Sequence, residues 1–291
     1  MSSHRDPVDV LEQRLRRRIV RTIKEFGLIE EGDRVLVAVS GGKDSYGLLD
    51  LLTRIRARSP FPFELVAVHL DQVQPGYDGA PLAAWLADFT ARTGVPSEIV
   101  QRDTYSIVKR LTKEGGTYCA PCSRLRRGIL YDTAERLGCN KLALGHHRDD
   151  ALETLLLNLF YSGKLQAMPA GYTTNDGRFE VIRPLVEVAE ADLATYATLR
   201  GFPILPCNLC GSQAGLKREV MAGLLKRLEG EIPDVREVML AAIKNVKPSH
   251  LLDPRLAARA VAEPGEDPVE ALGGGCDGPA PTGEAVVTIT G

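Results

Sequence analysis

Residues 40–45, Ser-Gly-Gly-Lys-Asp-Ser, form the segment of the chain with the clearest chemistry. Two adjacent glycines let successive backbone N–H groups point into one concavity, where they bind an anion. Lys43 adds a mobile cation to this site, and Ser40 and Ser45 add hydroxyl donors. Asp44 would repel a polyphosphate unless a hard cation such as Mg²⁺ lay between them. The segment therefore predicts a polyphosphate site; the alternative is an ordinary turn in which Asp44 only lies in the first turn of a helix.

The order of these residues is not that of a Walker A loop, which places four residues between its first glycine and the Gly-Lys pair. It resembles instead the SGGxDS PP-loop of the N-type ATP pyrophosphatase superfamily, whose members split ATP between its α and β phosphates. The resemblance implies ATP and Mg²⁺ as ligands, and AMP and pyrophosphate as products. It also implies catalytic roles for Lys43 and Asp44, and ATP-binding roles for all six residues of the loop: Ser40, Gly41, Gly42, Lys43, Asp44 and Ser45.

A second polar segment, Gly145-His-His-Arg-Asp-Asp150, follows an apolar run and precedes a predicted helix. It resembles the GHxxDD signature of the same superfamily. By that resemblance Gly145 and Asp150 belong to the ATP site, and Asp150 is a catalytic acid that is linked to Mg²⁺ or handles a proton. Asp149 competes for that role. The plain alternative is that Asp149 or Asp150 only caps the helix, and each acid can take a different role.

Four of the six cysteines form two Cys-x-x-Cys pairs, Cys119 with Cys122 and Cys207 with Cys210. The first pair leads into a predicted helix, whose N-terminus and neighbouring arginines favour thiolates. Thiolates bind soft metals or attack sulfur. The residues alone leave open a redox disulfide, a zinc site made by both pairs, and coincidental core cysteines.

These motifs together resemble the tRNA 2-thiocytidine synthetase (TtcA) family over roughly residues 12–252. The resemblance implies an ATP-dependent tRNA sulfurtransferase that adenylates the C2 oxygen of cytidine 32 in the anticodon loop and replaces it with sulfur. It implies a [4Fe–4S] cluster on Cys119, Cys122 and Cys210, with Cys207 as the rival third ligand. The implied partners are tRNA, ATP, a sulfur donor such as a cysteine desulfurase, and a second copy of the chain in a homodimer.

Three other functions remain open at this point. The enzyme could thiolate a uridine, or Cys122 and Cys210 could transfer sulfur through a persulfide and a disulfide without a cluster. The third possibility is a nucleotide-binding regulatory module that has lost its catalytic activity and in which all four paired cysteines bind a structural zinc ion. That reading predicts zinc in the protein and no release of pyrophosphate.

The elements that must position these residues alternate between strands and helices. The β-branched run at 35–39 predicts a buried parallel strand, and further strands are expected at 63–71, 97–101, from 141 and at 179–184. Their alternation with helices favours a doubly wound α/β fold with a five-stranded parallel sheet. Ligands of such sheets lie at the carboxyl ends of the strands. Asp71 and the loop from Gln72 to Tyr77 leave the second strand at that edge, where the resemblance places the adenosine of ATP.

Helical additions are expected at both ends of this sheet domain. An amphipathic helix at 8–26 lies in a basic N-terminal segment, 1–28; the PP-loop domain with its cysteine site spans 29–212; helices follow at 213–252. From 253 to 291 the composition shifts to Ala, Pro, Gly and Glu, which is typical of a disordered tail. The candidate RNA contacts are five arginines on the first helix and beside the first cysteine pair: Arg17, Arg18, Arg124, Arg126 and Arg127.

Composition limits the remaining possibilities. The chain has 291 residues, a net charge of −2 and 44% hydrophobic residues, which permits a large core and argues against a uniformly basic nucleic-acid binder. No stretch approaches about 18 consecutive apolar residues, and the N-terminus lacks the apolar core of a signal peptide. We therefore expect a cytoplasmic protein with reduced cysteines and no membrane partner.

Overall fold

The structure is a computed structural model that describes residues 6–112, 119–205 and 217–256. The chain divides into two units, residues 1–243 and 244–291. All the site residues placed below lie in the first unit. Of the second unit, the structure describes residues 244–256, which include a short 3₁₀ helix, η1 (Pro248–His250). Most of the segment predicted to be a disordered tail lies outside the described residues.

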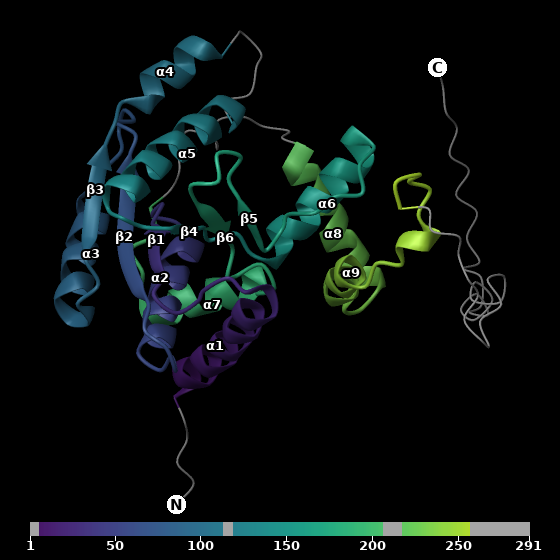
Figure 1. The fold of residues 1–291 in the computed structure, drawn as a ribbon, viewed down its shortest axis with the longest axis horizontal. Coiled ribbons are helices and arrows are strands. Elements are labelled where there is room, and N and C mark those ends of the chain that lie inside the picture. The colour runs from purple at the N-terminus through teal and green to yellow at the C-terminus, as the bar shows by residue number, and fades with distance from the viewer. Residues whose placement is uncertain (1–5, 113–118, 206–216, 257–291) are drawn as a thin grey trace, which may run out of the picture. The chain divides into compact units, whose positions relative to one another are not determined.

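A six-stranded sheet forms the centre of the first unit (Figure 1). Its strands run in the order β3 (Ser97–Gln101), β2 (Glu64–Asp71), β1 (Arg34–Ala38), β4 (Lys141–Ala143), β6 (Glu180–Ile182) and β5 (Gly171–Thr173). The first five are parallel, which confirms the five-stranded parallel sheet. The sixth strand, β5, is antiparallel to β6 and was not expected. It has only three residues and no alternation of apolar and polar side chains, so the sequence carries no strand signal there.

The sheet is covered on both faces because successive residues of a strand point to opposite sides. Val35 and Val37 of β1 belong to one core with α1 (Pro7–Phe26), α2 (Lys43–Arg56), α3 (Ala80–Thr93) and α7 (Glu190–Arg200). Leu36 belongs to a second core with α5 (Cys119–Arg136), against which α4 (Thr104–Leu111) packs. The expected doubly wound fold is therefore present, and the strand order reverses direction between β1 and β4.

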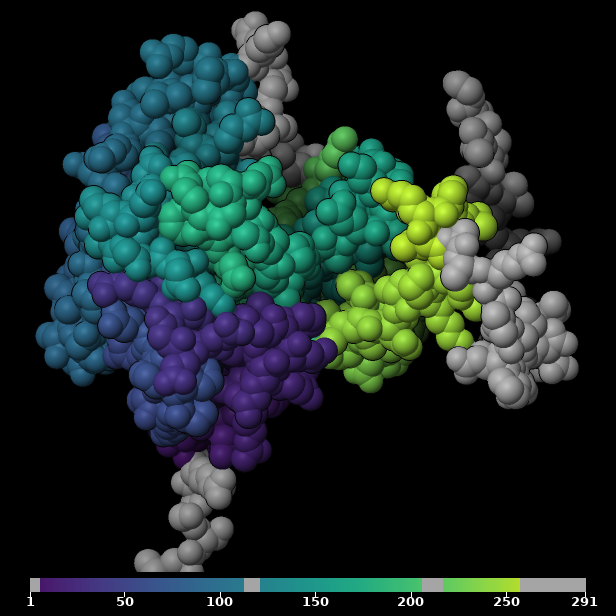
Figure 2. All heavy atoms as spheres, in the orientation of Figure 1, coloured from purple at the N-terminus to yellow at the C-terminus, as the bar shows by residue number. Residues whose placement is uncertain are grey.

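Helix α1 forms as its sequence predicts. The Asp6 carboxylate accepts a hydrogen bond from Val8 N at 3.0 Å, Pro7 is the first helical residue, and Gly27 ends the helix in the left-handed conformation at φ 61°. Its buried stripe packs against α2 and α7. Figure 2 shows α1, in purple, as part of the surface on this face of the unit. The stripe consists of Leu11, Leu15, Ile19 and Ile23.

Three further helices, α6 (Arg148–Ser162), α8 (Lys217–Glu231) and α9 (Val235–Lys244), share a separate small core. Leu152 and Leu156 of α6 pack against Met221 and Leu225 of α8. Helices were expected at 213–252, and the described part of that segment contains α8 and α9. None of the helices in the described ranges is both long enough and apolar enough to cross a membrane.

Candidate nucleotide and cysteine site

The Ser-Gly-Gly-Lys-Asp-Ser segment joins β1 to α2 in a tight loop. Gly41 has φ 87°, a conformation that favours glycine, and its carbonyl accepts a hydrogen bond from Leu205 N at 2.9 Å. The Ser45 hydroxyl closes the loop, because it accepts from Ser40 N at 3.0 Å and donates to Gly42 O at 2.8 Å. Helix α2 begins at Lys43, so its first N–H groups have no partners within the helix and face an anion site at this loop.

Gly145 allows the loop after β4 to lie directly on this first loop. A Cβ atom at residue 145 would lie 3.2 Å from both Asp44 C and Ser45 N, which are backbone atoms with little freedom to move. The two polar segments that the sequence singles out therefore meet at the carboxyl ends of β1 and β4. This is the point where the strand order reverses, which is where doubly wound sheets bind ligands.

Asp44 and Asp150 meet around one histidine at this point. His147 Nε2 lies 3.4 Å from Asp150 Oδ2 and 3.9 Å from Asp44 Oδ2. Asp150 also caps α6, since its carboxylate accepts from His147 N at 3.0 Å. Capping and proximity to the loop are thus both true of Asp150. Asp149 lies 3.9 Å from the other ring nitrogen of His147, Nδ1, and its carboxylate also binds Arg236 at 2.6 Å and Glu190 N at 2.8 Å.

The carboxyl group of Asp44 fits a hard cation. Its Oδ1 is buried and has no hydrogen-bond partner among the described residues. Burial raises the pKa of Asp44, while the nearby His147 and Lys43 act in the opposite direction. Mg²⁺ is usually held by one or two carboxylates together with substrate phosphates, which matches the pair of Asp44 and Asp150. Within the described ranges, no larger group of His, Cys, Asp and Glu is arranged as a metal site.

Lys43 is held by two acids. Its Nζ lies 2.7 Å from Glu190 Oε1 and 3.2 Å from Asp44 Oδ2. Burial alone would lower the pKa of Lys43, but the hydrogen bond and charge of Glu190 and the charge of Asp44 outweigh it and raise the pKa. The lysine therefore stays charged. Glu190 begins α7, far along the chain, and only its place at a helix start marks it in the sequence.

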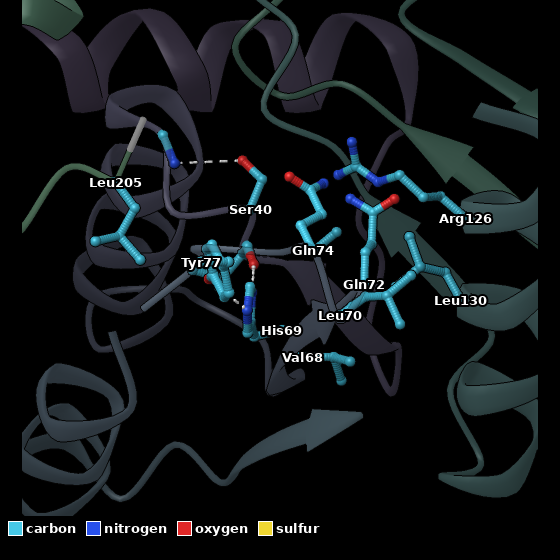
Figure 3. Close-up of a pocket in the computed structure, with 13 residues that line it drawn as sticks. Ser40, Val68, His69, Leu70, Gln72, Gln74, Tyr77, Arg126, Leu130 and Leu205 are labelled. Atoms are coloured by element: carbon cyan, nitrogen blue, oxygen red, sulfur yellow. Dashed lines mark hydrogen bonds between the residues drawn. The ribbon is translucent and has the colours of Figure 1, made fainter. Parts of the chain in front are cut away.

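A cavity opens beside the loop at the ends of β1 and β2 (Figure 3). Ser40 and Gly42 line it from the loop, Gln72 and Tyr77 from the segment after β2, and Arg126 from α5. The Tyr77 hydroxyl lies 2.9 Å from His69 Nε2, and Val39 O lies 2.8 Å from His69 Nδ1. Gln72 and Tyr77 belong to the loop that was expected at this edge, although neither was singled out as a site residue, and Leu205 was not predicted. The signal for the first two was their place just after a parallel strand.

Asp71 stands at the expected sheet edge but does not line this cavity. Its Oδ1 accepts from Val73 N at 2.9 Å, and its Oδ2 from Gln101 Nε2 at 3.2 Å. The first bond stabilises Val73 in a left-handed conformation at φ 57°, which is uncommon for a β-branched residue. The predicted ATP-binding role of Asp71 stays a prediction, and its neighbour Gln72 is the residue that faces the cavity.

The first cysteine pair lies at the start of α5, as expected, next to this cavity. Cys122 is buried, and its Sγ lies 3.3 Å from Gln72 Oε1. The side chain of Cys119 and both Cys207 and Cys210 lie outside the described residues, so the choice of third ligand stays a prediction. The helix start and Arg126, which follows Cys122 by one helical turn, favour a thiolate at Cys122 that could bind an iron–sulfur cluster. Cys139 is buried at the end of α5, and burial raises the pKa of its thiol, which suits a structural role.

The predicted RNA-contacting arginines fall on two separate surfaces. Arg124 and Arg127 are exposed on α5, close to the cavity that Arg126 lines. Arg17 borders an apolar groove formed with the end of α2 and with Phe61 and Phe63, which precede β2. That groove lies at the amino ends of the strands, opposite the Ser-Gly-Gly loop. Arg18 binds Glu237 of α9 at 2.8 Å and so connects α1 to α9.

Residues 11–204 match the family model of the PP-loop domain. The chain is 52% identical over 257 residues to the tRNA-cytidine(32) 2-sulfurtransferase of Neisseria gonorrhoeae, an alignment that covers 88% of this chain and 79% of the relative. It is 54% identical over 246 residues to the protein of that name from Verminephrobacter eiseniae, with 84% and 77% covered.

A solved structure similar to this one is the U34-tRNA thiolase NcsA from Methanococcus maripaludis with its [4Fe-4S] cluster. The two share 20% sequence identity and a TM-score of 0.64, and the match covers 83% of this chain and 81% of the other. At this level of identity the likeness shows a common fold.

Proposed function

The chain belongs to the PP-loop domain family and, within it, to the tRNA-cytidine(32) 2-sulfurtransferases, and from this premise we propose that it uses ATP to replace the C2 oxygen of cytidine 32 with sulfur. The observation that carries the proposal is that one cavity is lined both by the loop that would bind ATP and by the helix that begins with the cysteine pair. The Ser-Gly-Gly loop lines it on one side, and the helix that begins with the first cysteine pair lines it on the other. Activation of an oxygen and delivery of sulfur require that proximity.

The loop residues position ATP for attack at its α-phosphate. The phosphates bind to the first N–H groups of α2 and to the Gly41 and Gly42 amides. The Lys43 ammonium leaves Glu190 and binds the phosphates, where negative charge develops during the reaction. Asp44 and Asp150 would hold Mg²⁺, which neutralises the charge of the leaving pyrophosphate. Their carboxylates would otherwise repel ATP, so nucleotide and cation bind together.

The base reacts in two balanced steps. The C2 oxygen of cytidine attacks the α-phosphorus, the bond to the β-phosphate oxygen breaks, and pyrophosphate leaves. Sulfur at the oxidation level of sulfide then adds at C2 as the nucleophile, and the C–O bond breaks with AMP as the leaving group. Without adenylation the oxygen is a poor leaving group. A loop nucleotide can leave its stack to enter such a cavity, which suits the anticodon loop.

Cys119, Cys122 and Cys210 would hold a [4Fe–4S] cluster, which supplies an iron without a protein thiolate that can carry sulfur. The place of Cys122 at a helix start, one helical turn before Arg126, supports this assignment. A cysteine desulfurase would supply the sulfur as a persulfide, which a thiol reductant converts to sulfide with the two electrons required, and we expect a homodimer. Since tRNA and ATP meet in the cytoplasm, that is the proposed compartment.

The test is anaerobic purification of the full chain, followed by iron, sulfide and zinc analysis and by nucleoside analysis of tRNA after reaction with ATP. We expect about four irons per chain, as three thiolates imply for this cluster type. The iron should be lost in Cys122→Ala and Cys210→Ala and kept in Cys139→Ala. The expected products are 2-thiocytidine, AMP and pyrophosphate. Zinc without iron, or sulfur on a uridine, would refute the corresponding part of the proposal.

A further inference from the structure

Gln72 touches both halves of the site. It follows β2 directly, and its side chain lines the cavity beside Ser40 and Gly42. The same side chain accepts from Cys122 Sγ at 3.3 Å and from Thr104 Oγ1 at 3.1 Å. Figure 3 shows the Gln72 and Gln74 amides in the part of the cavity between Ser40 and Arg126. One amide therefore lies between the nucleotide cavity and a candidate metal ligand.

The backbone of Gln72 is fixed on the same side. Its carbonyl accepts from Tyr105 N at 3.4 Å, in the first turn of α4, and Thr104 is buried. Val108 of α4 packs against Cys122 in a small apolar cluster. Because α4 and the start of α5 are packed together around Cys122, a change at the Gln72 side chain is passed to the cysteine rather than absorbed by a loose loop.

The amide can take two orientations with opposite polarity. When Cys122 is a thiol, Gln72 Oε1 accepts the hydrogen bond from its S–H group. The NH₂ group of the amide, Nε2, then lies at the other end, away from the sulfur. A sulfur that binds a metal has no hydrogen to give, so an amide oxygen against it would be repelled. The amide must turn so that Nε2 donates to the sulfur and to the Thr104 hydroxyl, which also accepts. After this rotation Oε1 lies where Nε2 was before, on the side of the amide that faces away from the sulfur.

We propose that Gln72 is a positioning residue that couples nucleotide binding in the cavity to metal binding at Cys122. With metal bound, the turned amide presents an acceptor for a donor group of the nucleotide, such as an amino or hydroxyl group. The metal at Cys122 and the nucleotide in the cavity thereby favour the same orientation of the amide. Binding of either one increases the affinity for the other by the same factor. This inference rests on the proposed function, which makes the cavity a nucleotide site and Cys122 a metal ligand.

Two leucine variants form a matched pair for the test. Gln72 and Gln74 both line the cavity and are both half-buried, but in the described structure the Gln74 side chain has no hydrogen bond to Cys122 or Thr104. The dissociation constant of α,β-methylene ATP is measured for full-length protein with and without iron, at the same Mg²⁺ concentration in both cases. In the wild type and in Gln74→Leu, we expect the iron-loaded protein to bind the analogue at least about fivefold more tightly than the iron-free protein. In Gln72→Leu the two dissociation constants should differ by less than about twofold.

Equal ratios in the wild type and Gln72→Leu, or no difference in the wild type, would overturn the proposal. The conservative variant Gln72→Glu adds a separate readout, since a carboxylate cannot donate to a bound sulfur. Its iron–sulfur absorbance should decay faster with a chelator than that of Gln72→Leu. An equal or slower decay would also count against the proposal. Thermal unfolding of each variant shows whether the fold is intact.

A second measurement needs no iron and separates this inference from the proposed function. In metal-free protein, the rate of Cys122 alkylation by iodoacetamide is followed by mass spectrometry with and without the ATP analogue. We expect the analogue to change this rate several-fold in the wild type and Gln74→Leu, but not in Gln72→Leu. If the protein takes up no iron, the cluster assignment fails while this comparison still decides the coupling. An equal response in Gln72→Leu would refute it.

Discussion

At the scale of single residues, Gly145 decides how closely the two polar loops approach. Any Cβ at this position would be forced against the backbone of Asp44 and Ser45 at 3.2 Å. We predict that Gly145→Ala lowers kcat/KM for tRNA thiolation by roughly threefold to tenfold, because the loop must shift by a few tenths of an ångström and a shift of about 1 Å would cost about 100-fold. The measurement is steady-state thiolation at saturating ATP.

The control for this prediction is Gly223→Ala in α8, where a Cβ would meet nothing within 4 Å. That substitution should raise the free energy of unfolding by about 0.5 kcal/mol and leave kcat/KM unchanged. If Gly145→Ala keeps wild-type activity, the position of the loop does not depend on contact with residue 145.

The residue types of this site were readable from the sequence, but their division of labour was not. The segment 145–150 offered Asp149 and Asp150 as competing acids, and only the structure shows that Asp150 faces Asp44 across His147 while Asp149 faces Arg236. Glu190 was missed because its contact with Lys43 spans 147 residues. Gln72 was expected at this sheet edge as part of the loop after the second strand, but its contact with Cys122 was not predicted, because the two residues are 50 positions apart.

At the scale of elements, Asp149 connects three helices. It lies in the first turn of α6, accepts from Glu190 N of α7 and pairs with Arg236 of α9 at 2.6 Å. Burial alone would raise the pKa of Asp149, but the Glu190 N–H, Arg148 and Arg236 outweigh it and lower the pKa. A carboxylate whose pKa is lower in the folded state stabilises the fold above its unfolded pKa, and the effect is lost as pH falls through the folded value.

We therefore predict that Asp149→Asn lowers the free energy of unfolding by about 2 kcal/mol at pH 7, since Arg148 and Arg236 each lose a charged hydrogen-bond partner and are left with Glu237 and Glu229. The difference from the wild type should stay constant down to about pH 5 and shrink as pH falls below about 4. Urea unfolding at several pH values measures it. Asp88→Asn, which breaks an exposed pair with Arg92, should change stability by less than about 0.5 kcal/mol. A difference that grows towards low pH would contradict this account.

The order of strands and helices followed from the sequence because each parallel strand is an apolar run bounded by turn residues. Helix α1 matched its periodicity from Pro7 to Gly27. The short edge strand β5 could not be predicted, since its pairing depends on β6 rather than on its own three residues. The packing of α6 against α8 was also invisible, because it joins apolar side chains more than 60 residues apart.

At the scale of the whole molecule, a chain with net charge −2 must bind a polyanion through local patches. Two such patches are present in the described structure, one on α5 near the cavity and one on α1 beside the groove at the opposite edge of the sheet. Strand β2 has eight residues, so the two edges are about 26 Å apart. Because the Debye length is about 8 Å at physiological salt, the two patches act independently.

Cytidine 32 of the tRNA must reach the cavity. We therefore predict that the arginines on α5 make the tRNA contacts that lie nearest to the cavity. The double variant Arg124→Gln and Arg127→Gln should weaken tRNA binding and reduce the slope of log K against log salt by about 1 to 2, since each phosphate contact contributes about 0.7 to 0.9. The matched double variant Arg17→Gln and Arg21→Gln, on exposed positions of α1, should change the slope by less than about 0.5. Filter binding across a salt series measures both. An equal loss of slope in the α1 variant would show that tRNA also spans the far edge of the sheet, and that the charge of α1 serves RNA binding rather than solvation of an exposed helix face.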